Sequence, residues 1–148
     1  MDISKLILGT AQIGLNYGVN NFSGKINKKE SFKILKKAYD LGIRSLDSSE
    51  KYGDAHQVIG EFHILYPNCI FKIITKIPFK EEINNINIKI ENYLSDLKVT
   101  HLECLLFHSF ESYKKNKNLF NELVVLKKNK KIYNIGVSVY TNDEIEEL

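Results

Sequence analysis

Four residues that can give up or accept protons each stand at or just after the end of a short apolar run. Asp47 ends one run and Tyr52 follows it by five positions, while Lys76 and His108 end the next two runs. Carboxyl, phenol, ammonium and imidazole groups are the side chains that enzymes use for acid–base chemistry. Taken singly, each has an ordinary explanation as a helix cap, a turn residue or a solvated terminus. Gathered in one place, they could transfer protons.

Five apolar runs predict the strands that would gather them. The runs are continuous rather than alternating, which is typical of a parallel sheet covered on both faces. They cover residues 5–9, 43–47, 70–76, 102–108 and 133–139. The carboxyl ends of parallel strands meet at one edge, where α/β proteins build their sites. We therefore expect the four side chains to share that edge.

Amphipathic segments between the runs predict helices. We expect helices over residues 28–41, 55–65 and 119–128, and a fifth that begins at the N-cap residues following Tyr140. A further helix is indicated by a stripe at three- and four-residue spacing, formed by Ile83, Ile86, Ile90, Leu94 and Leu97. Strand and helix alternate about every 30 residues, as in right-handed βαβ units.

Two architectures use this alternation, the doubly wound sheet and the (β/α)8 barrel. The length of 148 residues suits a five-stranded doubly wound sheet, whereas a complete barrel needs about 250 residues. The polar groups at successive strand ends favour the barrel. In addition, no Gly-x-Gly-x-x-Gly follows a strand, which argues against the Rossmann mode of dinucleotide binding.

Composition excludes several other classes. With 43% hydrophobic and 26% charged residues, the chain has the make-up of one globular domain, residues 1–148. The net charge of +3 comes from scattered basic residues, so we expect no nucleic-acid partner. No apolar stretch is long enough for a bilayer span, and we expect no membrane association. Two cysteines within apolar runs favour the reducing cytoplasm, and no ligand spacing indicates a metal.

Five separated motifs resemble the aldo-keto reductase family. Residues 42–53, Gly-Ile-Arg-Ser-Leu-Asp-Ser-Ser-Glu-Lys-Tyr-Gly, are similar to its signature Gly-x-Arg-x-x-Asp-Thr-Ala-x-x-Tyr-Gly. The other four motifs lie in residues 8–14, 74–76, 105–108 and 135–138. The resemblance runs in order along essentially the whole chain. It implies a partial (β/α)8 barrel with five parallel strands, an oxidoreductase activity and a small carbonyl substrate, either an aldehyde, a ketone or a sugar.

The resemblance also implies roles for individual residues. Tyr52 would be the general acid, Asp47 and Lys76 would tune it, and His108 would orient the substrate carbonyl. An ammonium such as that of Lys76 stabilises the phenolate left when a tyrosine gives up its proton. The hydride would come from NADPH, with NADH as the alternative, because no side chain can supply one. The residues implied to contact this cofactor are Thr10, Asp47 and Ser138.

Some positions depart from the family pattern. His56 stands where the family usually has Glu, and we expect it on the helix surface. Lys130 replaces a frequent Gly, and Val139 replaces a frequent Asn. We expect Phe110 and Tyr113 to form part of a substrate wall.

The length is the largest departure from the family. We expect the chain to be the N-terminal part of a longer enzyme, truncated in the fifth helix and with little activity alone. The alternative is a non-catalytic half-barrel, a binding or assembly module that self-associates through its open edge. A third alternative is a barrel enzyme that uses Lys76 as a Schiff base, which would leave Tyr52 and Asp47 without a role.

Overall fold

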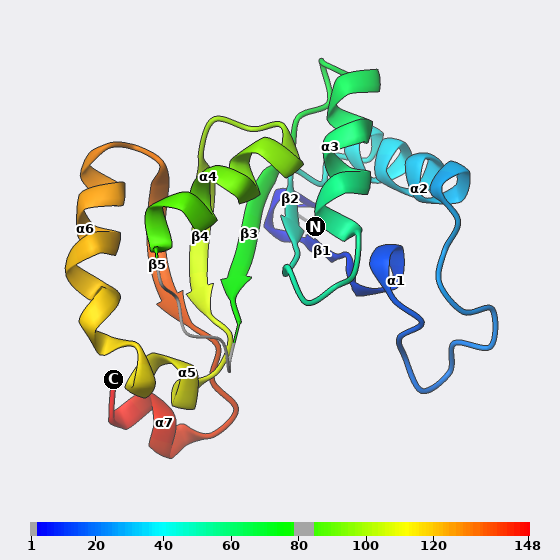
Figure 1. Ribbon diagram of the computed structural model, residues 1–148. Helices are drawn as coiled ribbons and strands as arrows, with labels where there is room; N and C mark the ends of the chain where they lie inside the picture. Colours follow the sequence, from blue (N-terminus) through cyan, green and yellow to red (C-terminus); the bar gives the residue numbers. More distant parts are fainter. Residues whose placement is uncertain (1–2, 79–84) are drawn as a thin grey trace.

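A five-stranded parallel sheet forms the centre of the molecule, as the apolar runs predict (Figure 1). The structure, a computed structural model, describes residues 3–78 and 85–148. The strands pair in sequence order, each with the next one along the chain. They are β1 (Ile7–Gly9), β2 (Ser45–Asp47), β3 (Lys72–Ile77), β4 (Leu102–Phe107) and β5 (Ile132–Val137). A sequential all-parallel order is that of a (β/α)8 barrel, so the predicted partial barrel is confirmed.

Four longer helices connect successive strands, and three short ones follow strand ends. The longer helices are α2 (Lys28–Asp40), α3 (Ala55–Leu65), α4 (Ile86–Leu97) and α6 (Phe120–Lys128). The short helices are α1 (Ala11–Gly14), α5 (Phe110–Lys115) and α7 (Asn142–Glu146), and short 3-10 turns cover Ile3–Lys5 and Lys117–Leu119. In Figure 1 the strand arrows point toward the side of the molecule where α1, α5 and α7 lie. The carboxyl ends of the strands therefore share one edge.

Side-chain caps explain where several helices begin. Asn27 accepts a hydrogen bond from the backbone N–H of Glu30, and Asn85 accepts one from that of Ile88. Thr141 and Glu144 form a reciprocal capping box at the start of α7. After α6, Lys130 adopts a φ of +58°. This left-handed conformation suits glycine better than lysine, which explains why glycine is frequent at this position in the family pattern.

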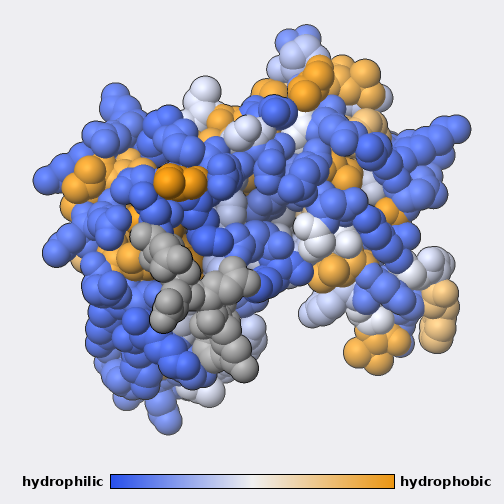
Figure 2. All heavy atoms as spheres, viewed as in Figure 1, coloured by the Kyte–Doolittle hydropathy of each residue, from blue (hydrophilic) through white to orange (hydrophobic). Residues whose placement is uncertain are grey.

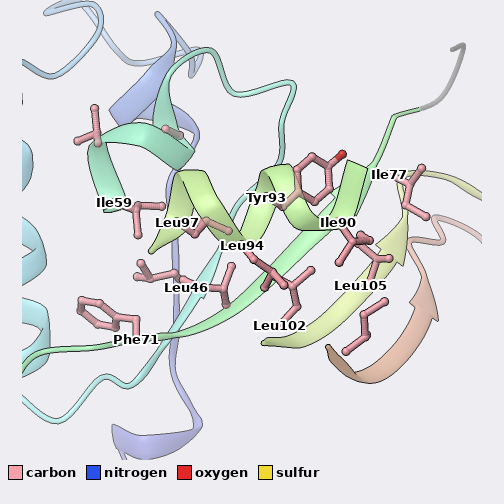
Figure 3. Close-up of a cluster of buried hydrophobic side chains, with 14 of the residues drawn as sticks. Leu46, Ile59, Phe71, Ile77, Ile90, Tyr93, Leu94, Leu97, Leu102 and Leu105 are labelled. Atoms are coloured by element: carbon pink, nitrogen blue, oxygen red, sulfur yellow. The ribbon is translucent and has the colours of Figure 1, made fainter. Parts of the chain in front are cut away.

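The core lies between the helices and the sheet (Figure 3). Ile90, Leu94 and Leu97 of α4 point toward the strands, where Leu46 and Leu105 are fully buried. This confirms the apolar stripe predicted for α4, apart from Ile83, which lies outside the described residues. Each large aliphatic side chain removed from water in this way contributes about 1.5–3 kcal/mol. The packed layer holds the strand ends in fixed positions relative to one another.

Several boundaries differ from the sequence prediction. The first strand begins at Ile7, because Ile3–Lys5 forms a 3-10 turn instead. The third begins at Lys72, since Ile70 is 43% exposed and lies before the sheet. The helix α5 was not predicted.

Within the described ranges, no helix combines the length and the apolar character that crossing a bilayer requires.

Candidate active site

Asp47, Lys76 and Tyr52 meet at the carboxyl edge of the sheet. Asp47 is the last residue of β2 and Lys76 lies near the end of β3. The Lys76 Nζ lies 2.6 Å from Asp47 Oδ1, 3.0 Å from the Ser48 carbonyl oxygen and 3.4 Å from the Tyr52 hydroxyl oxygen. Its side chain is 9% exposed, against 34% for Asp47. The ammonium is thus a nearly buried charge that bridges a carboxylate and a phenol.

Thr10 connects the ends of β1 and β2. Its hydroxyl donates to the Asp47 carbonyl oxygen over 2.9 Å, and its backbone N–H donates to the same oxygen over 3.0 Å. The Thr10 side chain is fully buried. A cavity of about 340 Å³ opens beside this connection and is lined by Gly9, Thr10, Asp47 and Tyr52 together with residues of α1 and the loop after it. The pair of bonds fixes the backbone of Asp47 at the cavity wall.

His108 joins the site through Ser49. The His108 Nδ1 lies 3.4 Å from the Ser49 hydroxyl oxygen, and its backbone N–H donates to the Ile77 carbonyl oxygen over 3.1 Å. Burial and, second, the nearby Lys76 ammonium lower the pKa of His108 below its ordinary value of 6.5. The imidazole is therefore neutral at neutral pH. Ser49 in turn accepts from the Tyr52 backbone N–H at its carbonyl oxygen, over 3.0 Å. His108 is thus connected through Ser49 to the group formed by Asp47, Tyr52 and Lys76.

Ser138 stands beside His108 on the neighbouring strand end. Its backbone N–H donates to the Phe107 carbonyl oxygen over 2.9 Å, directly before His108 in the chain, and its side chain is half-buried. Three strand ends thus place Thr10, Asp47 and Ser138 along the same edge of the sheet. This arrangement agrees with their predicted location at the shared edge.

The expectation of a surface role for His56 was wrong. His56 is 3% exposed and its Nε2 lies 2.9 Å from the Thr75 hydroxyl oxygen, directly before Lys76 in β3. Burial lowers its pKa to about 4. Helical spacing explains the burial, because His56 lies three residues before Ile59 and seven before His63 on the inner face of α3. The residue supports β3 from behind the site.

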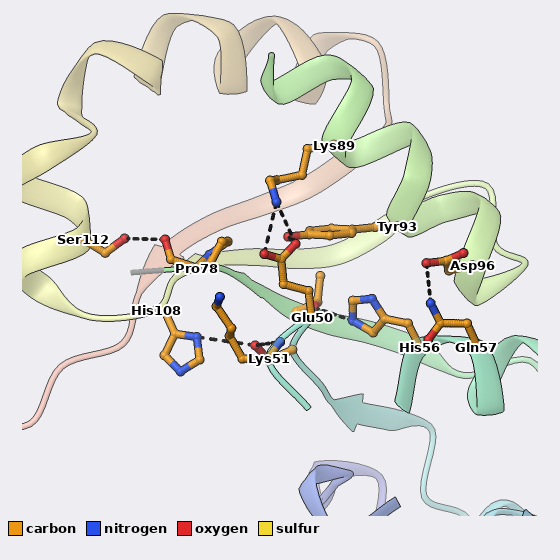
Figure 4. A network of polar contacts seen from close by, with 12 residues as sticks. Glu50, Lys51, His56, Gln57, Pro78, Lys89, Tyr93, Asp96, His108 and Ser112 are labelled. Carbon is orange, nitrogen blue, oxygen red and sulfur yellow. Dashed lines mark hydrogen bonds and ion pairs between the residues drawn. The ribbon is translucent and has the colours of Figure 1, made fainter. Parts of the chain in front are cut away.

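Glu50 braces the same segment from the other side (Figure 4). Its carboxylate accepts from Lys89 Nζ over 2.8 and 3.1 Å and from the Tyr93 hydroxyl, both on α4. Both ion-pair side chains are only about one-fifth exposed, at 22% and 19%. Glu50 and Ser49 are the two site residues that the sequence analysis missed. Their position between Asp47 and Tyr52 was the available signal, but their partners lie 39 and 59 residues away.

Two glycines let the Tyr52 segment approach α1. A Cβ on Gly14 would lie 1.6 Å from the Tyr52 carbonyl oxygen, and one on Gly53 would lie 2.4 Å from the Gly14 carbonyl oxygen. Gly53 also has a φ of +55°. Side chains at these positions would push the two backbones apart, which explains the glycines in both motifs.

The substrate-wall expectation was wrong for Phe110. This side chain is only 5% exposed and packs against Tyr113 with ring centroids 6.1 Å apart. Ser109 caps α5 by accepting from the backbone N–H of Ser112, and Phe110 is the first, buried residue of that helix. As for metals, no cluster of three or more potential ligand side chains occurs within residues 3–78 and 85–148.

The chain is similar to known proteins in sequence and in fold. The model of the aldo/keto reductase family matches residues 5–148. No curated protein matches the chain in sequence.

Three solved structures illustrate the likeness in fold. A Pseudomonas aeruginosa protein described as a candidate aldo-keto reductase is 24% identical, with a TM-score of 0.77 over 93% of this chain and 56% of its own. The holo form of an aldo-keto reductase from Bacillus halodurans is 17% identical, with a TM-score of 0.73 over 97% and 48%. An aldo/keto reductase from Klebsiella pneumoniae, in complex with NADP and acetate, is 21% identical, with a TM-score of 0.66 over 96% and 48%. The chain thus spans about half the length of the solved structures that it matches.

Proposed function

Because the chain belongs to the aldo/keto reductase family, we propose that its site serves the NADPH-dependent reduction of a carbonyl group in a small molecule, an aldehyde, ketone or sugar, in the cytoplasm. The observation that carries the proposal is the contact of Lys76 Nζ with both Asp47 and Tyr52, at 2.6 and 3.4 Å. A phenol beside a buried ammonium is suited to give a proton to an oxygen that is becoming negatively charged.

Tyr52 is the proton donor in this proposal. When its proton leaves, negative charge develops on the phenol oxygen, and the Lys76 ammonium at 3.4 Å stabilises that charge. Asp47 and the Ser48 carbonyl oxygen hold the ammonium in place. Because the ammonium is nearly buried, its field is screened less than it would be in water.

His108 orients the substrate oxygen. The neutral imidazole can donate one hydrogen bond, and a donor aimed at the carbonyl oxygen stabilises the charge that develops there during reduction. A protonated imidazole would instead repel the Lys76 ammonium. The lowered pKa of His108 therefore suits a donor that stays neutral throughout.

Thr10, Asp47 and Ser138 are the residues proposed to hold the nicotinamide end of the cofactor. The cavity of about 340 Å³ beside Gly9, Asp47 and Tyr52 offers a polar recess at the strand ends that fits this group. When bound, NADPH supplies the hydride that no side chain can provide. NADPH is proposed over NADH because NADP is the cofactor bound by the Klebsiella pneumoniae structure.

The cytoplasm is proposed because both cysteines are free thiols.

The test combines cofactor binding with turnover of the 148-residue chain. We expect NADPH to raise the melting temperature and a panel of aldehydes to oxidise NADPH, measured by its ultraviolet absorbance. Because this chain spans half the length of its structural relatives, we expect the rate to be low. Tyr52→Phe should lower kcat by roughly 10²-fold or more while NADPH binding is kept. Unchanged kcat in Tyr52→Phe, or the absence of both binding and turnover, would contradict the proposal.

A second candidate is a non-catalytic half-barrel module that self-associates. The observation that favours it is a difference in exposure between the two faces of the sheet. Ile73 and Leu105 are buried, whereas Ile74, Cys104 and Leu106, which alternate with them along β3 and β4, are only half-buried. A partly exposed apolar sheet face is suited to pairing with another surface. A dimer mass by light scattering, with no NADPH-induced rise in melting temperature, would favour this candidate over the reductase.

A further inference from the structure

Ser49 is a fully buried hydroxyl in contact with the imidazole of His108. Its Oγ lies 3.4 Å from His108 Nδ1 and 3.2 Å from the backbone nitrogen of Lys51. Figure 4 shows the bond running from the His108 ring toward the segment that carries Lys51. We propose that Ser49 is a positioning residue that donates its proton to Nδ1 and thereby fixes His108 in the tautomer with the ring proton on Nε2.

The direction of the bond follows from counting donors and acceptors. The Lys51 backbone N–H can only donate, so Ser49 Oγ accepts at that contact. The hydroxyl still has one proton to place, and His108 Nδ1 is its one remaining hydrogen-bond partner within the described parts of the chain. A buried hydroxyl proton without an acceptor costs about 1–3 kcal/mol. Donation to Nδ1 avoids this cost and requires Nδ1 to be unprotonated.

A tautomer is meaningful only for a neutral ring, and the surroundings of His108 keep it neutral. Burial, Lys76 and Lys51 lower its pKa, while Asp47 and Glu50 act in the opposite direction with a smaller total effect. With Nδ1 occupied by Ser49, the ring presents a single N–H on the opposite side. This N–H is the donor that the proposed reduction requires, and in this respect the inference rests on the proposed function. The opposite tautomer would present a lone pair, which repels a carbonyl oxygen.

The neighbouring Ser48 provides a matched control. It is also fully buried, but its Oγ has no hydrogen-bond partner among the described residues. The two serines are adjacent, have the same size and differ in whether the hydroxyl reaches the imidazole. Removing each hydroxyl in turn separates an effect on His108 from a general effect of disturbing this segment.

The experiment is nitrogen NMR of the full chain with ¹⁵N-labelled histidine, at a pH where the rings are neutral. His108→Asn identifies the His108 signals by their loss. In the wild type we expect a protonated Nε2 and an unprotonated Nδ1 at His108. Ser49→Ala should shift the two signals toward a mixture of tautomers, Ser49→Thr should restore the wild-type pattern, and Ser48→Ala should leave it unchanged.

Activity gives a second readout. With an aldehyde and NADPH, Ser49→Ala should lower kcat roughly three- to tenfold, the size of one lost hydrogen bond, with a smaller change in KM. Ser49→Thr should recover most of the loss.

The inference is overturned if His108 carries its proton on Nδ1 in the wild type, which needs no variant, or if a folded Ser49→Ala chain keeps the wild-type signals. Because the spectra do not depend on turnover, failure of the proposed reductase activity is recognised separately. An inactive chain with the expected tautomer would contradict the function and leave the positioning role intact.

Discussion

Two loops follow neighbouring strands at the same edge of the sheet, and they are built in opposite ways. Residues 47–53, which begin with the last residue of β2, are fixed by contacts with Lys76 of β3, with His108 directly after β4 and with Lys89 of α4. Residues 15–27, after β1 and α1, form hydrogen bonds within the loop, such as those from Asn21 to the carbonyl oxygens of Tyr17 and Gly24. Their other hydrogen bonds reach the adjoining helices α1 and α2 and the exposed side chain of Asp54.

The exposure of the two loops differs accordingly. In residues 47–53, the side chains of Ser48 and Ser49 are fully buried. In residues 15–27, Val19 is 99% exposed and Phe22 is 94% exposed. Figure 2 shows hydrophobic side chains protruding at the lower right, where Figure 1 places this loop. The residues proposed for proton chemistry thus lie in a segment held by contacts with several elements, whereas the loop next to them buries little of its apolar surface.

The largest expected effect comes from Gly53→Ala. The new Cβ would lie 2.4 Å from the Gly14 carbonyl oxygen at a φ of +55°, so the fixed loop would have to move away from α1. We expect the free energy of unfolding, measured by urea denaturation, to fall by roughly 3 kcal/mol or more. Gly24→Ala in the exposed loop is the control, because its φ is +75° but its Cβ would meet nothing closer than 3.9 Å. It should cost about 1 kcal/mol; equal losses in both variants would contradict the contrast between the loops.

A pH effect is expected from His56, behind the fixed loop. Its folded pKa of about 4 lies below the ordinary 6.5, so between these values the unfolded chain binds a proton that the folded chain does not. The free energy of unfolding should therefore fall by about 3 kcal/mol as the pH drops from 6.5 to 4. His56→Gln, which can still bond to Thr75, should remove most of this slope. The rest should remain, because burial also lowers the pKa of His63. An unchanged slope in His56→Gln would show that His56 is not the titrating group.

The ion pairs of the two loops should differ in strength. Lys89→Met removes a pair with Glu50 whose side chains are about one-fifth exposed, and we expect a loss of about 1–2 kcal/mol in thermal or urea unfolding. Lys25→Met removes the pair that ties the exposed loop to Asp54, with side chains 43% and 49% exposed. That loss should stay below about 0.5 kcal/mol. A larger loss for Lys25→Met than for Lys89→Met would reverse the comparison.

The smallest effect is expected from Ser48→Ala. This substitution removes a buried hydroxyl that has no partner within the described residues, so the folded chain loses no hydrogen bond. We expect the free energy of unfolding to stay unchanged or to rise by about 0.5 kcal/mol. A loss above about 1 kcal/mol would show that this hydroxyl is satisfied in solution.

The sequence analysis predicted the features that depend on neighbours in the chain. Continuous apolar runs indicated all five strands, and the shared carboxyl edge of parallel strands placed Lys76 with Asp47. Contacts between distant segments were not predictable in this way. The bond of Ser49 to His108 spans 59 residues, and no local pattern encodes which side chain of a loop points at a given strand. The surface position expected for His56 was wrong, because its spacing of three residues from the buried Ile59 places it on the inner face of α3.

The strict sequential order of the sheet has a consequence for how the chain reaches this structure. When a strand leaves the ribosome, the strand with which it pairs has already been synthesised and precedes it by one helix. No strand has to insert between two strands that have already paired. The nascent polypeptide can therefore add its βα units in the order of translation, and the edge that carries Asp47 and Lys76 is complete once β3 has docked.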